Sequence, residues 1–232
     1  MTKFADDLKV DVKKIFAEQW KSRDGQKVPE PEDVGLGNDA VKLKGTVLYA
    51  DLSDSTGLVR DYKAWFAAEV YKAYLLSAAR IIRSSGGVIT AYDGDRVMAV
   101  FVGDSKNSDA ATCGLKINYA VQKIVQPALS AQYEKVRFRL SQTVGIDTCD
   151  LWVARTGIRG SNDLVWVGNA ANYAAKLTGL GSDWPTRISE AVYNSLRPNA
   201  KTGGNPKKNM WTSLGASDIG ISVYGSSWRY PV

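Results

Sequence analysis

The chain has 232 residues, no histidine, two cysteines and a net charge of +6. This length suffices for one domain with appendages and a full hydrophobic core. The lack of histidine excludes His-based triads and nearly excludes zinc chemistry, and we expect Cys113 and Cys149 to be core thiols. The modest positive charge favours an anionic partner such as a nucleotide. Nucleic acid is not expected as a partner, because it would usually require a denser basic stripe with interleaved aromatic side chains.

The N-terminal segment is expected to be a helix followed by a linker. Within residues 3–20, apolar residues recur at helical spacing: Phe4, Leu8, Val12, Ile15 and Phe16. Residues 21–39 are rich in Pro, Gly and charge, which indicates a linker of about twenty residues. We expect residues 1–44 to form this helix and linker, and residues 45–232 to form the main domain. The first residues lack the apolar core of a secretory signal, and no apolar run is long enough to cross a membrane, so we expect a cytoplasmic protein.

The main domain is expected to alternate strands and helices. In chain order, the predicted elements are a strand at 45–52, a helix at 62–84, a strand pair at 88–92 and 96–102, a helix at 108–132, strands at 136–147, 151–155 and 164–167, a helix at 170–180, a strand near 186, a short helix at 190–196, and late strands around 211 and at 221–224. No glycine fingerprint of a dinucleotide fold accompanies them. The order predicts an α+β protein, a ferredoxin-like βαββαβ sandwich with extra strands.

Two aspartates lie at the ends of predicted strands, Asp51 in VLYADLSDST and Asp95 in YDGDRVMAVF. Each stands where an apolar residue would continue the strand pattern, and a buried carboxylate needs a partner. A pair of carboxylates with water suits Mg²⁺ or Mn²⁺, with the phosphates of a substrate completing the shell. The alternative is that one aspartate caps a helix and the other lies in a turn. As a pair, they predict a metal site for a phosphate-bearing substrate.

Three motifs, in this order along the chain, resemble those of the class III nucleotidyl cyclases. They are YADLSDST at 49–56, GDRVMAVF at 94–101 and WVGNAANYAAKL at 166–177. The resemblance spans roughly residues 45–180 and implies that residues 45–232 form a class III cyclase catalytic domain. It implies an in-line attack of the ribose 3′-hydroxyl on the α-phosphorus of a nucleoside triphosphate, with pyrophosphate as the leaving group.

The resemblance also implies a set of ligands for the metal and the triphosphate. Asp51, Leu52 and Asp95 would form the metal site, which holds two Mg²⁺ or Mn²⁺ ions. Ser55 and Thr56 open a predicted helix, whose first turn can present backbone N–H groups to the triphosphate. A role in capping the helix is equally open for Thr56 and for the preceding Asp54.

The third motif carries the implied catalytic residues, Asn172 and Lys176, which share one helix face because they are four residues apart. By the resemblance, Asn172 orients the ribose, and Lys176 stabilises charge on the α-phosphate in place of the family's Arg. In that family these two residues come from the other subunit, which implies a homodimer with composite active sites. The alternative is that both side chains merely solvate an exposed helix face.

The chain departs from the family pattern at the positions that contact the base of the nucleotide. The positions that contact a purine in adenylate cyclases hold Ala91 and Val165, neither of which can form a side-chain hydrogen bond. Tyr49 is bulky enough to shrink the pocket, and Arg96 can donate to a pyrimidine carbonyl. In this the chain resembles the bacterial pyrimidine cyclases of antiphage signalling, which make cyclic UMP or cyclic CMP for a downstream effector. We expect UTP rather than CTP, because Val165 offers no acceptor for the cytosine amino group.

Other interpretations remain open. Ordinary strand packing would also explain Tyr49, Ala91 and Val165. An adenylate cyclase with atypical base contacts, an inactive cyclase-like module that binds a nucleotide and dimerises, and a palm-type polymerase or diguanylate cyclase are the alternative functions. The last of these lacks support, since no GGDEF-like hairpin occurs. Tyr224 replaces a late-strand lysine of the family, and the candidates to take over its triphosphate contact are Arg155, Arg159 and Arg229.

Overall fold

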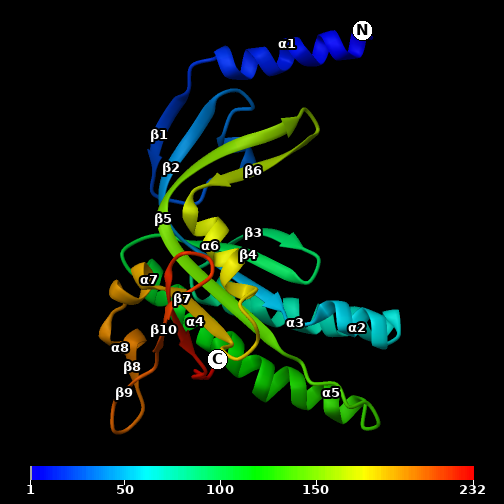
Figure 1. The fold of residues 1–232 in the computed structure, drawn as a ribbon, viewed down its shortest axis with the longest axis vertical. Coiled ribbons are helices and arrows are strands. Elements are labelled where there is room, and N and C mark those ends of the chain that lie inside the picture. The colour runs from blue at the N-terminus through cyan, green and yellow to red at the C-terminus, as the bar shows by residue number, and fades with distance from the viewer. Residues whose placement is uncertain (1) are drawn as a thin grey trace. The chain divides into compact units, whose positions relative to one another are not determined.

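The computed structural model describes residues 2–232 (Figure 1). The chain divides into two compact units, which we describe separately. The first unit comprises the described residues up to Lys44 together with Asp150–Gly168, and the second comprises Gly45–Cys149 and Asn169–Val232. Strands β2 (Asp39–Leu52) and β5 (Gln142–Ile158) each continue from one unit into the other. Within residues 2–232, no helix is both long and apolar enough to cross a membrane.

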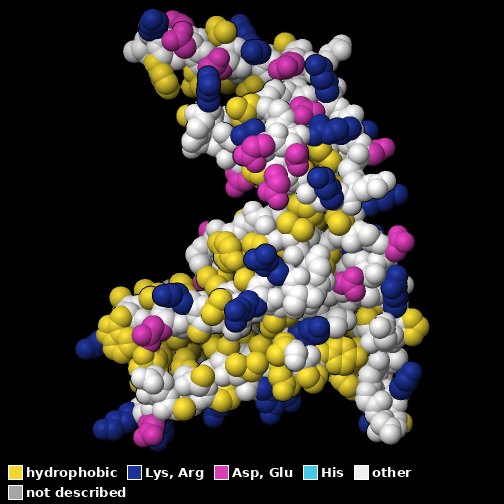
Figure 2. All heavy atoms as spheres, turned by 180° about the vertical axis from the view of Figure 1, so that it is seen from behind, with side chains coloured by type: hydrophobic (Ala, Val, Ile, Leu, Met, Phe, Trp, Pro, Cys, Tyr) yellow, Lys and Arg dark blue, Asp and Glu magenta, His cyan; other side chains and the backbone are white. Residues whose placement is uncertain are grey.

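The first unit begins with helix α1 (Lys3–Ala17), as the apolar spacing predicts. None of its described side chains is buried, and its large apolar residues are exposed: Phe4, Leu8, Val10, Val12, Ile15 and Phe16. Charged and apolar side chains alternate over this helix at the top of Figure 2. The helical pattern alone therefore predicted the element, although nothing in the described structure covers its apolar face.

The linker expected after α1 is wrong in part, because a strand and a helical turn lie within it. Strand β1 (Lys21–Gly25) pairs in parallel with the start of β2, from Lys21 opposite Asp39 to Gly25 opposite Leu43. The 3₁₀ helix η1 (Pro31–Asp33) follows it. The sheet therefore begins about twenty residues earlier than the composition of this segment indicates.

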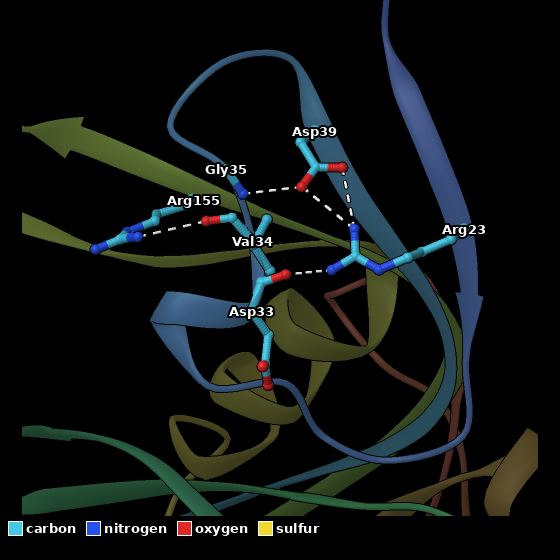
Figure 3. Close-up of polar contacts among 6 residues, drawn as sticks. All are labelled: Arg23, Asp33, Val34, Gly35, Asp39 and Arg155. Atoms are coloured by element: carbon cyan, nitrogen blue, oxygen red, sulfur yellow. Dashed lines mark hydrogen bonds and ion pairs between the residues drawn. The ribbon is translucent and has the colours of Figure 1, made fainter.

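A single carboxylate closes the loop between β1 and β2 (Figure 3). Asp39 accepts hydrogen bonds from the Arg23 guanidinium at 3.1 and 3.2 Å and from the Gly35 N–H at 2.8 Å. Arg23 also donates to the carbonyl of Asp33. The hydrogen bond from the Gly35 N–H is the main cause that lowers the pKa of Asp39, and the Arg23 guanidinium lowers it further. The contacts of Arg23 reach residues 10 and 16 positions away, so the Pro- and Gly-rich composition alone did not predict them.

The two strands expected at 136–147 and 151–155 are one strand, β5, and residues 136–141 lie outside it. Its second half pairs antiparallel with β6 (Ser161–Val167) in the first unit. The backbone of residues 138–140, just before β5, forms hydrogen bonds with the side chain of Gln126 and not with a neighbouring strand. Gln126 accepts from the Leu140 N–H at 2.7 Å and donates to the Phe138 carbonyl at 3.1 Å.

In the second unit, helices pack on a sheet of mixed direction, as the α+β prediction requires. Its helices are α2 (Ser55–Asp61), α3 (Ala64–Ser84), α4 (Lys106–Ala120), the π-helical turn η2 (Val121–Val125), α5 (Gln126–Gln132), α6 (Asn169–Thr178), α7 (Glu190–Asn194) and α8 (Pro198–Lys201). Its other strands are β3 (Val88–Asp93), β4 (Arg96–Phe101), β7 (Thr186–Ser189), β8 (Thr202–Gly203), β9 (Lys208–Asn209), β10 (Thr212–Ala216) and β11 (Ser222–Ser226). The helix predicted at 108–132 is thus divided by η2, and the helix predicted at 62–84 begins at Ala64, after the separate helix α2.

The strand order is β10-β11-β7-β5-β2-β4-β3, with β1 attached to β2 and β6 attached to β5. The run β2-α3-β3-β4-α4-β5 reproduces the predicted βαββαβ order. Helix α3 buries Val70, Tyr74 and Ala78 at intervals of four residues, and they join one core cluster with Ala50 and Val97 of the sheet. The core therefore lies directly behind the ends of β2 and β4.

Gln126 is expected to stabilise this unit. The variant Gln126→Ala leaves the Leu140 N–H and the Phe138 carbonyl without their side-chain partner. Because an unsatisfied buried group costs about 1–3 kcal/mol, we expect a loss of that order in the free energy of unfolding, measured by urea denaturation. Gln132→Ala, at the exposed end of α5, is the control. Equal stability of the two variants would contradict this role.

Candidate active site

A cavity of about 650 Å³ lies at the end of β2, and three segments of the second unit line it. The residues are Asp51, Leu52, Ser53, Asp54, Ser55 and Thr56 from the β2–α2 junction, Asp93, Gly94, Asp95 and Arg96 from the β3–β4 turn, and Thr178, Gly179, Gly181 and Ser182 from the end of α6 and the turn after it. The first two sequence motifs therefore meet in one cavity. The third segment follows the third motif and was not predicted.

Antiparallel pairing of β2 with β4 brings the two aspartates together. The register places Asp51 opposite Arg96, and Asp95 immediately precedes Arg96 in the turn. Gly94 takes φ +61° in this turn, a left-handed conformation that glycine adopts without steric cost. Burial raises the pKa of Asp51 above its ordinary value, and the negative charge of Asp95 raises it further. The Arg96 charge and a hydrogen bond from Thr178 act in the opposite direction without reversing the shift.

This pair of carboxylates fits a divalent cation, because a cation would relieve the repulsion that burial intensifies. The Leu52 side chain belongs to the core cluster, so only the backbone of Leu52 can take part in such a site. In the described part of the chain, no group of three His, Cys, Asp or Glu side chains is placed to hold a metal. The remaining ligands would therefore be backbone, water or substrate oxygens, as Mg²⁺ commonly uses.

Helix α2 begins beside these carboxylates. Asp54 is its N-cap, in a left-handed conformation with φ 57°, and its side chain accepts from the Gly57 N–H at 3.3 Å. The capping role considered for Asp54 is thus confirmed, whereas Thr56 lies inside the first turn instead of capping it. Ser55 and Thr56 both line the cavity, next to Asp51.

Tyr49 and Arg96 are neighbours across β2 and β4. The Arg96 guanidinium lies 5.9 Å from the centroid of the Tyr49 ring. Asp93 holds Arg96 through hydrogen bonds of 2.6 and 3.1 Å, and Asp93 also lines the cavity. Sequence reasoning missed Asp93, although its position three residues before Arg96, across an Asp-Gly turn, was a signal for this ion pair. Burial is the main reason that the pKa of Tyr49 is raised.

The other residues expected at the base lie on two different strands. Ala91 is exposed on β3, opposite Met98 of β4. Val165 lies on β6 in the first unit and is 38% exposed. Their side chains are apolar, so neither supplies a hydrogen bond to a base.

Asn172 and Lys176 lie exposed on α6, whose buried face carries Ala170, Ala174 and Leu177. The Lys176 ammonium lies 5.9 Å from the centroid of the Tyr173 ring. Neither Asn172 nor Lys176 is among the residues that line the cavity of their own chain. The structure thus brings residues of the first two motifs together, and it leaves the pair predicted to be catalytic, Asn172 and Lys176, exposed.

The basic residues considered for the triphosphate have different surroundings. Tyr224, which replaces the family's lysine, stacks on Tyr193 with ring centroids 3.8 Å apart, so this position serves packing. Arg155 donates to Asn162 at 2.7 Å and to the Val34 carbonyl at 3.5 Å, and it is therefore engaged within the first unit (Figure 3). Arg159 and Arg229 are exposed.

Comparison with models of known protein families gives no match. The chain is 50% identical over 220 residues to a curated uridylate cyclase from Xanthomonas perforans, and the match covers 94% of both chains. It is 51% identical over 230 residues to a uridylate cyclase from Burkholderia cepacia, covering 98% of this chain and 99% of that relative. The crystal structure of the adenylyl cyclase CyaB from P. aeruginosa is similar in fold, with a TM-score of 0.68 and 21% identity, covering 81% of this chain and 95% of that chain. The fold is therefore that of a class III cyclase catalytic domain, and the chain belongs to the uridylate cyclase family of nucleotidyl cyclases.

Proposed function

We propose that this nucleotidyl cyclase is metal-dependent and converts UTP to 3′,5′-cyclic UMP and pyrophosphate. The observation that carries the proposal is the meeting of Asp51 and Asp95 in one cavity beside Tyr49 and Arg96. The names of the relatives from Xanthomonas perforans and Burkholderia cepacia support the choice of UTP.

Asp51 and Asp95, together with the backbone of Leu52, would hold two Mg²⁺ or Mn²⁺ ions. Such ions, when bound, lower the pKa of the ribose 3′-hydroxyl and neutralise charge on the phosphates. Ser55 and Thr56 lie in the first turn of α2, where free backbone N–H groups favour an anionic phosphate. The chain itself therefore contributes mainly positioning and charge, as phosphoryl transfer requires.

Arg96 and Tyr49 would bind the base. A guanidinium presents donors only, which suits the carbonyl oxygens of uracil. The hydrogen bonds from Arg96 to Asp93 fix the plane of those donors before a substrate arrives. With Ala91 and Val165 unable to form hydrogen bonds, the groups that would select a purine are missing.

Asn172 and Lys176 would complete the active site of a partner subunit in a homodimer. Both side chains are exposed on α6 and lie outside the lining of their own cavity, which is compatible with a role in trans. Asn172 would orient the ribose, and Lys176 would stabilise the transition state at the α-phosphate. We extend the proposal to signalling in the cytoplasm. By resemblance to antiphage pyrimidine cyclases, cyclic UMP would be the second messenger and would bind a downstream effector.

Incubation of the purified protein with each of the four nucleoside triphosphates and Mn²⁺ tests the substrate. Chromatography is expected to show cyclic UMP from UTP, with about tenfold less cyclic product from CTP, ATP or GTP, because a buried polar group left without its partner costs about 1–3 kcal/mol and about 1.4 kcal/mol corresponds to a factor of ten. Mg²⁺ in place of Mn²⁺, and chelation by EDTA, are the matched conditions. A cyclic product from ATP alone would refute the pyrimidine assignment.

Asp51→Asn removes the charge that Asp95 repels, so activity and stability should change in opposite directions. The folded pKa of Asp51 is raised, so its ionised form costs stability at neutral pH, and the cost disappears below the ordinary pKa of 3.8, where both states are protonated. We expect a higher metal-free Tm than in the wild type at pH 7, a difference that vanishes in acid, and at least about 10²-fold lower turnover. Asp104→Asn, at an exposed loop position, is the control. Full activity with a lowered Tm would argue against the metal site.

Composite active sites can be tested by mixing two inactive variants. Asp51→Ala damages the site of its own subunit, whereas Lys176→Ala damages the site of its partner. A mixed dimer therefore has one intact site, and a random mixture is expected to recover roughly a quarter of wild-type activity, because about half of the dimers are mixed and each has one of two sites. The double variant Asp51→Ala/Lys176→Ala, mixed with the wild type, is the control for exchange of subunits. An inactive mixture whose subunits demonstrably exchange would refute shared sites.

A further inference from the structure

The turn after α6 forms a wall of the candidate cavity that none of the three motifs includes. Gly179, Gly181 and Ser182 of this turn line the cavity. The two carboxylates of the candidate metal site, those of Asp51 and Asp95, line it as well. The groups that the turn presents therefore decide what can bind beside these carboxylates.

Arg187 of β7 holds the turn from the side away from the cavity. It is 2% exposed, and it is not among the described residues that line the cavity. Its guanidinium donates to the carbonyls of Leu177 at 3.4 Å, Leu180 at 3.1 Å and Gly181 at 2.7 Å. A guanidinium keeps its charge in a protein, and its burial is costly unless such bonds are formed. The carbonyls of the turn are therefore held toward the interior.

The direction of these carbonyls fixes the direction of two N–H groups. In a trans peptide group, the C=O of one residue and the N–H of the next point in opposite directions. The carbonyls of Leu180 and Gly181 both point to Arg187. The N–H groups of Gly181 and Ser182 therefore point away from Arg187, toward the cavity that both residues line. Gly181 takes φ +92°, and such a left-handed residue is typical of backbone nests, in which successive N–H groups face one anion.

Both N–H groups are available to a ligand. Within residues 2–232, neither the N–H of Gly181 nor that of Ser182 donates a hydrogen bond to the protein. A backbone N–H is a strong donor that seldom stays without an acceptor in a folded protein. Since both residues are exposed, water or a ligand oxygen in the cavity supplies that acceptor.

Helix α6 is held closely on the sheet, which fixes the start of the turn. A Cβ atom at Gly145 of β5 would lie 2.1 Å from the Ala174 carbonyl oxygen and 2.8 Å from the Leu177 Cβ, so only glycine allows this approach. The turn is thus fixed at its start by the packing of α6 and along its length by Arg187. Its two N–H groups are therefore oriented before a ligand arrives.

The surroundings favour a phosphate oxygen as the ligand atom. The charge of Arg187 lies behind the same two peptide groups and polarises them, which strengthens their N–H groups as donors to an anion. Asp51 and Asp95 would repel a bare anion, so the phosphate would bind as its complex with a divalent cation. Asp183, the residue after the turn, is exposed to water, where its charge is screened.

We propose that the N–H groups of Gly181 and Ser182, held by Arg187, form a nest that binds the triphosphate of the nucleotide together with its divalent cation. This inference rests on the proposed function and deepens it, because it assigns contacts with the substrate to a segment outside the three motifs. The contact involves phosphate oxygens and not the base, so it would be the same for any nucleoside triphosphate.

The decisive experiment replaces one N–H group by an oxygen atom. Nonsense suppression installs lactic acid at position 182, which gives the Ser182→Ala protein with an ester in place of that peptide group. Ser182→Ala itself is the matched control, because it keeps the N–H. Calorimetric titration measures the binding of inorganic tripolyphosphate with Mg²⁺ and, separately, of uridine. We expect about tenfold weaker tripolyphosphate binding in the ester variant, since a hydrogen bond to a charged group is lost, and unchanged binding of uridine.

Arg187→Met tests the support of the turn, and circular dichroism establishes whether the variant folds. If it folds, it should bind tripolyphosphate more weakly than the wild type, with Arg187→Lys between the two. Arg83→Met, which removes an exposed charge at the end of α3, is the control for net charge. An equal loss in Arg83→Met would contradict the role of Arg187.

Equal tripolyphosphate affinity of the ester variant and Ser182→Ala would overturn the proposal. A loss for uridine alone would overturn it too, because the nest would then bind the base. If the ester weakens tripolyphosphate binding but the wild type makes no cyclic UMP, the proposed function fails and the nest stands. If cyclic UMP is formed and the ester changes nothing, the nest fails and the proposed function stands.

Discussion

The register between β2 and β4 is the constraint on which the candidate active site depends. Thr46 to Asp51 pair with Phe101 to Arg96, and Val47, Leu48, Ala99 and Val100 in this ladder are fully buried. Because consecutive residues of this ladder are buried, both faces of the sheet are packed here, and a slip of one residue would exchange side chains of different size between the two faces. The packing on both faces therefore favours the register that places Asp51 beside the turn that carries Asp95. Burial in the core thus holds together two carboxylates that repel each other.

Holding an ionised Asp51 buried beside Asp95 costs free energy, and the groups around Asp51 offset part of this cost. An ionised Asp51 is disfavoured by burial and by Asp95, and it is stabilised by Arg96 and by the hydroxyl of Thr178. Arg96 is in turn held by Asp93, and the turn after Thr178 is held by Arg187. Arg96 and the turn after α6 are thus each held by a second contact, so the surroundings of Asp51 are fixed by the fold itself. Sites organised in this way bind charged transition states well, because little reorganisation remains when the reaction occurs.

The sequence predicted the elements whose signal is local and missed those that depend on distant contacts. Apolar spacing was enough for α1, the Asp93-Gly94 turn was enough for the β3–β4 hairpin, and the position of Asp51 and Asp95 at strand ends was enough to predict that they meet. The strand β1 was missed because its polar sequence pairs with β2 through contacts such as that of Arg23 with Asp39. The start of β5 was predicted too early because the backbone of the preceding segment forms hydrogen bonds with the Gln126 side chain and not with a strand. Arg187 carries no local signal, since an arginine in a short strand usually faces solvent.

Helix α6 carries residues of two different sites. Lys176 and Thr178 are two residues apart, which corresponds to roughly 200° around a helix, so they lie on opposite faces. Lys176 is exposed, and Thr178 is buried against the cavity of its own chain. In a homodimer with composite sites, one helix would therefore line its own site with Thr178 and present Lys176 to the partner's site. Because Gly145 and Arg187 hold this helix on the sheet, a displacement of the helix would alter both sites of such a dimer together.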